Sequence, residues 1–220
     1  MNKTLSTILS FFVTILIPIF LLMLGVRILL TPAFPEVEYR MLGFPEDSYG
    51  FTQAERLEYG KIAIEYLVND AGSEFLGDLT FADGETPLYN EREVSHMVDV
   101  KVLVKFGLRL WAWATGLLVI LGGWAWFGKW WQAYLAGAKR GGQLTLILTI
   151  LLGILGAINF RSFFTQFHHL FFEGDSWLFY YSDTLIRLFP MRFWSDAFLM
   201  EAIIVVGGAL WLAFGLKPRT

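Results

Sequence analysis

Long hydrophobic runs separated by polar segments dominate the pattern along this chain. A helix rises about 1.5 Å per residue, so about 20 apolar residues cross a hydrocarbon core of about 30 Å. Four runs approach or exceed this length and predict transmembrane helices at 1–30, 102–127, 144–160 and 193–216. The first run is longer than the apolar part of a signal peptide, which has about 7–15 residues. No convincing cleavage pattern follows it, so we expect a retained helix.

The segment 31–101, between the first two runs, has the pattern of a folded cap. Thr52 and Glu55 have the spacing of a capping box, in which each side chain bonds the backbone amide of the other residue. Apolar residues recur behind this box at helical spacing, which predicts an amphipathic helix at 53–69. An Asp-Gly pair at 83–84 favours a short hairpin. We therefore expect a small mixed α/β cap.

The remaining polar segments complete the predicted layout. We expect a loop at 128–143, a second loop at 161–192 and a short tail at 217–220. The fold class predicted from the whole pattern is an α-helical membrane protein, with four transmembrane helices and the small mixed α/β cap.

The distribution of charge predicts the orientation in the membrane. The N-terminal end, the 128–143 loop and the tail contain six Lys or Arg and no Asp or Glu, whereas 31–101 contains fifteen acidic and five basic residues. Short basic segments stay in the cytoplasm. We therefore expect a bacterial cytoplasmic membrane protein with both termini inside, and with the cap and the 161–192 loop at the outer interface.

Composition narrows the possible chemistry. Hydrophobic residues make up 55% of the chain, above the 45–50% or so of soluble domains, and 21 Phe and 9 Trp are present. There is no cysteine, which excludes disulfides, thiolate metal sites and a cysteine nucleophile. No Gly-x-Ser-x-Gly turn, phosphate-binding loop or basic patch suited to nucleic acid occurs.

Three histidines are candidates for acid–base chemistry, and all lie in the predicted outer segments. On a helix, Arg92 and Asp99 would share a face with His96 at spacings of four and three. A carboxylate there could orient the imidazole and raise its basicity. The alternative is an interfacial histidine that makes a single hydrogen bond.

His168 and His169 lie in an unusually aromatic segment of the second outer loop. A turn at 174–175 and an Asp183 that can cap a short helix ending at Pro190 predict a structured re-entrant loop. The aromatic density is also typical of an interfacial belt. A metal site is disfavoured because no His-x-x-x-His or His-Glu-x-x-His spacing occurs, so we expect neither metal nor cofactor.

A basic stripe at 101, 105 and 109 begins the second predicted span. These side chains can snorkel at the outer interface, and Arg109 could contact ester oxygens of a lipid.

Two segments resemble the lipoprotein intramolecular transacylase family of four-span bacterial membrane proteins. The matching residues are Arg92, Glu93, His96, Met97, Asp99, Val100 and Lys101, then Phe167, His168, Leu170, Phe171, Phe172, Trp177, Asp183, Leu185, Ile186, Pro190, Phe193 and Trp194. The resemblance implies catalysis by His96 and His168. Around them we predict supporting roles for Arg92, Asp99 and Asp183, and substrate contacts by Phe167, Phe171, Phe172, Trp177 and Arg109.

The reaction implied by this resemblance moves the sn-2 acyl chain of a diacylglyceryl-modified lipoprotein onto the amine of its own N-terminal cysteine. Amine and ester belong to one substrate, so the enzyme's main task is to fold that substrate back on itself. A histidine near pKa 6.5 is a suitable base for the amine, and a second can stabilise the oxyanion. The partners expected are lipoproteins and membrane lipids, not nucleic acid.

Two alternatives stay open from the sequence. One is a non-enzymatic membrane protein whose cap binds a lipid or a partner. The other is a hydrolase that releases the same acyl chain to water. The sequence also leaves open which histidine is the base.

Overall fold

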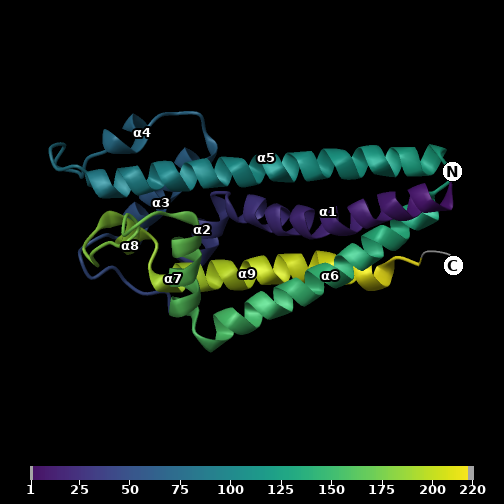
Figure 1. The fold of residues 1–220 in the computed structure, drawn as a ribbon. Coiled ribbons are helices and arrows are strands. Elements are labelled where there is room, and N and C mark those ends of the chain that lie inside the picture. Colours follow the sequence, from purple (N-terminus) through teal and green to yellow (C-terminus); the bar gives the residue numbers. More distant parts are fainter. Residues whose placement is uncertain (1, 218–220) are drawn as a thin grey trace. The chain divides into compact units, whose positions relative to one another are not determined.

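The computed structural model describes residues 2–217 and is mostly helical (Figure 1). Two compact units are formed: unit 1 by 2–27, 107–158 and 199–217, and unit 2 by 28–106 and 159–198. The elements are α1 (Lys3–Leu29), α2 (Ala33–Glu38), α3 (Gln53–Val68), α4 (Glu74–Gly77), α5 (Glu91–Phe127), α6 (Trp131–Ile158), α7 (Phe160–Phe171), α8 (Thr184–Leu188), α9 (Met191–Leu210) and η1 (Trp211–Gly215), a π-helical turn. The end of the predicted tail, 218–220, lies outside the described residues.

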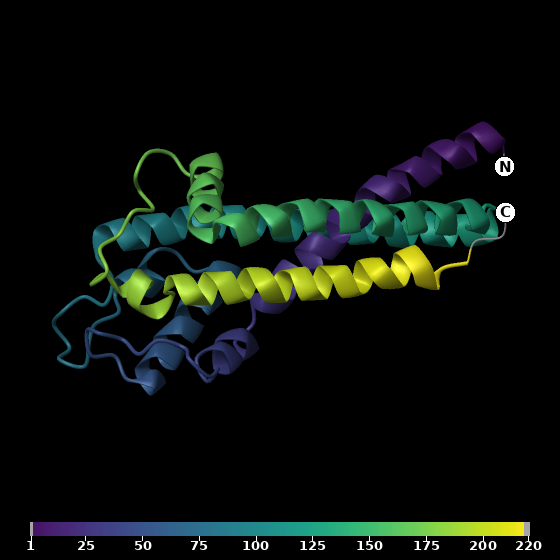
Figure 2. The same ribbon diagram turned by 90° about the horizontal axis from the view of Figure 1, so that it is seen from below.

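Four helices are long and apolar enough to cross a membrane, which confirms the four predicted transmembrane helices. They are α1, α5, α6 and α9 with its continuation η1. In unit 1 the start of α1, the α5–α6 turn and the end of η1 lie at the same end (Figures 1 and 2). The segment 131–143 differs from the predicted loop, because it forms the first half of α6. Its charged residues lower the hydropathy of the segment, but Lys and Arg are good helix formers.

Small residues allow close helix packing in unit 1. A Cβ atom on Gly137 of α6 would lie 2.5 Å from the Ser10 carbonyl oxygen of α1, and one on Gly141 would lie 2.5 Å from Ile17 Cβ. A Cβ atom on Gly142 would lie 2.8 Å from the Ala209 carbonyl oxygen of α9. Glycine at these positions lets the backbones approach closely, as is common in membrane helices.

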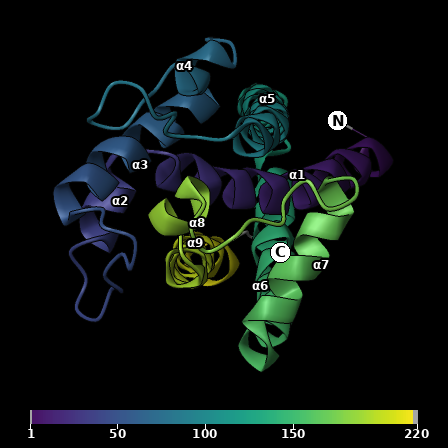
Figure 3. The same ribbon diagram turned by 90° about the vertical axis from the view of Figure 1, so that its left-hand side faces the viewer.

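Unit 2 is built around α3, which packs against α2, α4 and α8 (Figure 3). The predicted capping box is confirmed: the Glu55 amide donates to Thr52 Oγ1 at 3.2 Å, and the Thr52 amide donates to Glu55 Oε2 at 2.8 Å. The core is rich in aromatic and leucine side chains, among them Tyr66, Leu76 and Leu188.

The prediction of a mixed α/β cap is wrong. Residues 2–217 contain no strand, and the expected hairpin is reduced to an isolated bridge between Thr80 and Pro87. The Asp83 carboxylate accepts from the Thr86 amide at 2.9 Å and from its hydroxyl at 2.6 Å, which closes a tight turn. The ladder would extend if the Thr86 amide also donated to the Phe81 carbonyl oxygen, but that oxygen accepts from the Gly84 amide at 2.9 Å.

Candidate active site

The imidazole rings of His96 and His168 face each other inside unit 2. Their centroids are 6.2 Å apart and their planes differ by 24°. Both residues are buried, with 7% and 9% of their surface exposed. His96 comes from the first turns of α5 and His168 from the last turn of α7, so the pair joins two distant parts of the sequence.

Two caps determine where the helices that carry these rings begin. At α5, the Asn90 amide donates to Glu93 Oε2 at 2.8 Å, and the Glu93 amide donates back to Asn90 Oδ1 at 3.0 Å. At α7, the Ser162 amide donates to Asn159 Oδ1 at 3.0 Å. These hydrogen bonds satisfy backbone amides of the first turn and fix the residue at which each helix begins. The start of each helix in turn determines the position of the ring that it carries.

The protonation of His168 follows from its hydrogen bond. Its Nδ1 lies 2.8 Å from the Phe164 carbonyl oxygen, one helical turn earlier. A carbonyl only accepts, so Nδ1 carries the proton and Nε2 keeps a free lone pair. Burial lowers the pKa of His168 below its ordinary value, by more than the Phe164 carbonyl raises it. The ring is therefore neutral at pH 7, with Nε2 available as a base.

Aromatic side chains enclose the histidine pair. The Phe172 ring lies 4.9 Å from His96 and 5.5 Å from His168. Phe179 lies 5.4 Å from His96, and Trp177 lies 4.9 Å from His168. In the described chain His96 Nδ1 is buried and has no hydrogen-bond partner. Such surroundings exclude water and strengthen any electrostatic interaction with a bound substrate.

The segment between α7 and α8 is fastened to the start of α5. Arg92 donates from Nη2 to the Leu178 carbonyl oxygen. Asp183 accepts from the Tyr180 amide at 2.8 Å and from Asn90 Nδ2 at 3.3 Å. Asp183 is the N-cap residue of α8, but its side chain makes these bonds and does not cap that helix. Arg92 and Asp183 thus hold the aromatic segment beside the rings.

Comparison with known proteins identifies the family of this chain. The family described as "Lipoprotein intramolecular transacylase Lit" matches residues 11–194, which include both histidines. The chain belongs to the Lit family. A protein of Aquifex aeolicus (strain VF5), described as uncharacterized, is 33% identical over 211 residues, covering 93% of this chain and 89% of that one.

A solved structure of a Lit protein has the same fold as this chain. The structure of the membrane integral lipoprotein intramolecular transacylase Lit from Bacillus cereus matches with a TM-score of 0.81 at 23% identity, covering 96% of this chain and 94% of that one. A mutant form of the same protein matches with a TM-score of 0.74 at 22% identity, covering 95% and 89% of the two chains. This chain is thus a multi-pass membrane protein of a lipoprotein transacylase family.

Other predicted site residues of this Lit family member lie at the edge of the pair. Phe167 and Phe171 are half exposed, with 42% and 47% of their surface accessible. Their rings are 4.8 Å apart, and the Phe167 ring is 5.6 Å from His168. The exposed His169 contacts Trp177 at 5.2 Å, on a different side of α7 from the face that meets His96.

The predicted residues Asp99 and Arg109 have other surroundings. Asp99 is exposed and lines a separate groove of unit 2 with Ser73 and Tyr89, so it does not orient the His96 ring. Arg109 is exposed and belongs to unit 1. Within residues 2–217, no group of three or more His, Asp or Glu side chains could hold a metal ion.

The sequence did not predict the roles of three further residues. Phe164 supplies the carbonyl that orients His168, Phe179 packs against His96, and Glu93 accepts from the Leu185 amide at 2.7 Å, which joins α5 to α8. Phe164 could have been found, because it precedes His168 by four residues on a helix. The other two contacts are long-range and have no local signal.

Proposed function

We propose that this protein moves the sn-2 acyl chain of a diacylglyceryl-modified lipoprotein to the amine of that lipoprotein's N-terminal cysteine. His96 and His168 are the acid–base groups in this proposal. The observation that carries it is the pair of buried rings 6.2 Å apart, in a chain of the Lit family.

His168 is the proposed general base. Its Nδ1 proton is held by the Phe164 carbonyl oxygen, so the lone pair of Nε2 can take a proton from the substrate amine. The neutral amine nitrogen attacks the ester carbonyl carbon as Nε2 takes one of its protons, and a C–N bond forms. His96 stabilises the oxyanion of the tetrahedral intermediate by a hydrogen bond. The C–O bond to the glyceryl group breaks, and the proton taken from the amine passes to the glyceryl oxygen.

The substrate needs a surface on which its acyl chains can fold back. The half-exposed rings of Phe167 and Phe171, with Trp177 beside them, offer an apolar surface next to His168. Phe172 is buried and contacts both imidazoles. Holding amine and ester together in this way converts an unfavourable ring closure into a productive one.

Mass spectrometry of lipoprotein N-termini, from cells with and without this protein, tests the proposal. We expect a lyso-form that carries one acyl chain on nitrogen and a free glyceryl hydroxyl. A lyso-form with a free amine would indicate a hydrolase, and unchanged lipoproteins would indicate a non-enzymatic binding protein. Either of these two results overturns the proposed reaction.

We also propose that both termini face the cytoplasm of a bacterium and that the histidine pair faces outward. Lys217 belongs to the basic end of unit 1, whereas Glu85 belongs to the acidic cap, and both are exposed. The chain has no cysteine, so single cysteines can be read without background. An impermeant thiol reagent should label Glu85→Cys in intact cells and should label Lys217→Cys only after lysis. The reverse result would invert the orientation.

A further inference from the structure

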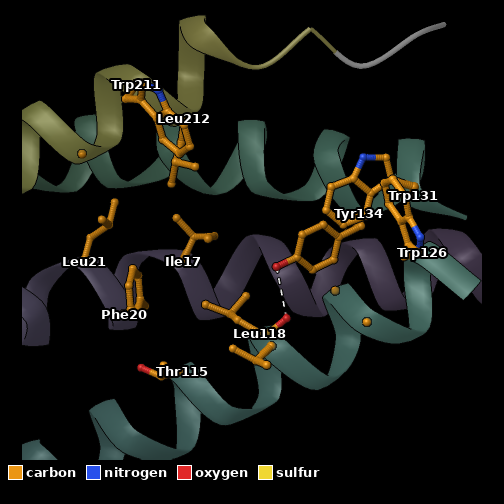
Figure 4. Close-up of a pocket in the computed structure, with 14 residues that line it drawn as sticks. Ile17, Phe20, Leu21, Thr115, Leu118, Trp126, Trp131, Tyr134, Trp211 and Leu212 are labelled. Atoms are coloured by element: carbon orange, nitrogen blue, oxygen red, sulfur yellow. Dashed lines mark hydrogen bonds between the residues drawn. The ribbon is translucent and has the colours of Figure 1, made fainter.

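A groove in unit 1 carries an inference about lipid binding that is independent of the acyl transfer. It has a volume of about 560 Å³, within the range of about 300–1,000 Å³ that is usual for small-molecule sites. All of its lining residues belong to unit 1, so it shares none with the histidine site. Figure 4 shows side chains from α1, α5, α6 and η1 around it.

The lining of the groove offers no polar group for a ligand other than the indoles at its rim. Tyr134 donates its phenol proton to the Leu118 carbonyl oxygen at 3.1 Å, and Thr115 donates to the Trp111 carbonyl oxygen at 2.7 Å (Figure 4 shows the first bond). The other side chains that line it are apolar, among them Ile17 and Leu118. A peptide would leave its backbone amides unpaired there, whereas a hydrocarbon chain would not.

The length of the groove suits the acyl chain of one leaflet. On α5 its lining begins at Thr115 and ends at Trp126. At 1.5 Å per residue this is about 16 Å, or about half of a hydrocarbon core of about 30 Å. Trp126, Trp131 and Tyr134 lie together at one end of it, next to the α5–α6 turn (Figure 4). Tryptophan and tyrosine are typical of the membrane–water interface.

The charge at this end is complementary to a phosphate. Lys129, in the α5–α6 turn, is exposed between the helices that carry Trp126 and Trp131. Lys3 in the first turn of α1 and Lys217 after η1 belong to the same end of unit 1. In the described part of unit 1 the one acidic residue is Glu201, which lies against Gly25 near the other end of α1.

We propose that this groove binds an anionic phospholipid. One acyl chain lies along α5 between Thr115 and Trp126, and the phosphate contacts Lys129. Basic residues next to a membrane helix attract anionic lipids in this way.

Two glycines of α5 provide a matched pair of variants. A Cβ atom on Gly123, which lines the groove, would have no heavy atom within 4 Å, and the same is true of Gly116, which does not line it. Leucine therefore fits at both positions without a clash at Cβ. Gly123→Leu fills the groove, whereas Gly116→Leu adds the same side chain to the same helix elsewhere.

The test uses purified full-length protein in nanodiscs with phosphatidylglycerol that carries a photoactivatable acyl chain. We expect labelling of the peptides that contain Leu118 and Trp126, and competition by unlabelled phosphatidylglycerol. Gly123→Leu should reduce this labelling about fivefold or more, and Gly116→Leu should not. Lys129→Gln should weaken labelling by about fivefold with phosphatidylglycerol but not with a phosphatidylcholine probe.

Three results would overturn the proposal. Labelling that is not saturable and is spread over all four spans would mean ordinary surrounding lipid. Labelling equal for the two headgroups would remove the role of Lys129. Protein–protein crosslinks at Trp126 or Trp211 would mean that a second copy of the chain covers the groove. If Gly123→Leu does not fold, competition by unlabelled phosphatidylglycerol in the wild-type protein still distinguishes a bound lipid from surrounding lipid.

Discussion

The two units bury different kinds of polar group. The buried polar residues of unit 1 are the hydroxyl residues Ser10, Thr145 and Thr149. Those of unit 2 are mostly ionisable: Glu38, Arg56, Glu93, His96, Lys101 and His168. A buried hydroxyl can bond a carbonyl of its own helix, as Thr145 does with Gly141 at 2.8 Å, but a buried charge needs partners from other elements.

This difference indicates that unit 1 is stabilised mainly by close helix packing, whereas unit 2 holds ionisable groups in fixed positions. In unit 1, glycines bring backbones together, and the partly buried Glu201 is the exception to its apolar interior. In unit 2, long-range bonds such as those of Glu93 and Arg187 hold charged groups in fixed positions. We therefore expect substitutions in unit 2 to act through ionisable groups, on activity, stability or pH dependence, and substitutions in unit 1 to act through helix packing, on stability.

The largest expected effect is on the histidine pair. His96→Ala and His168→Ala should each reduce lyso-lipoprotein formation by about 10²–10⁴-fold, because general acid–base groups contribute that much. His169→Ala should change it only a few-fold, since that ring is exposed and contacts Trp177. Mass spectrometry of a purified lipoprotein substrate measures the rate at which the lyso-form appears. Only variants that elute from size-exclusion chromatography as the wild type does are compared.

Two results would contradict this prediction. An inactive His169→Ala with an active His168→Ala would move the site by one residue. Three active variants would remove histidine catalysis altogether.

The next effect concerns the ion pair between Arg187 and Asp47 in unit 2. Arg187 Nη2 lies 3.0 Å from Asp47 Oδ2, and the two side chains are 9% and 3% exposed. The guanidinium also lies 3.6 Å from the centre of the Phe51 ring. Removing one partner leaves a buried charge unpaired, so Asp47→Ala should lower the free energy of unfolding by about 3–5 kcal/mol.

Thermal unfolding in detergent measures this loss, and an exposed ion pair is its control. Asp70, which pairs with Lys105, is fully exposed, so Asp70→Ala should leave the Tm nearly unchanged. Equal losses for the two variants would show that burial does not decide the strength of these pairs.

A smaller effect is expected from close packing in unit 1. A Cβ atom on Gly137 would lie 2.5 Å from the Ser10 carbonyl oxygen, which belongs to a backbone and cannot rotate away. Gly137→Ala should therefore destabilise unit 1 by about 1–3 kcal/mol. Gly153→Ala, in the same helix with no atom within 4 Å of the new Cβ, should be neutral or slightly stabilising. A Tm that rises in both variants would argue against the close α1–α6 contact.

The smallest effect is a pH dependence in unit 2. Burial, and then the neighbouring Asp196, raise the pKa of the Glu38 carboxyl to about 7. The folded state thus binds this proton more tightly than the unfolded state, whose pKa is near 4.5. The stabilisation that the protonated Glu38 carboxyl contributes is complete below pH 4.5 and is lost as pH rises through about 7. Glu38→Gln, which keeps a neutral side chain, should raise the Tm at pH 8 more than at pH 5.

Glu36 of the same helix is the matched control. Its hydrogen bond and ion pair with Lys61 lower the pKa of its carboxyl, so Glu36→Gln should not stabilise at pH 8. If both variants stabilise equally at pH 8, the effect comes from net charge and not from the burial of Glu38.

Much of the local structure of this protein is determined by its sequence. Long apolar runs specify four spanning helices, because a helix in lipid must satisfy its own backbone. The capping box specifies the start of α3 at Gln53, because its two hydrogen bonds join residues only three apart. The resemblance to the family depends on two short sequence segments, and these segments contain His96 and His168.

Only the tertiary structure decided which groups meet. His168 and not His169 faces His96, because the 100° between neighbouring residues of α7 turns one ring inward and the other to the surface. Asp99 has a suitable spacing from His96, yet it faces a different groove. Glu93 joins α5 to α8 across 92 positions. These outcomes depend on packing between distant segments, which local periodicity does not encode.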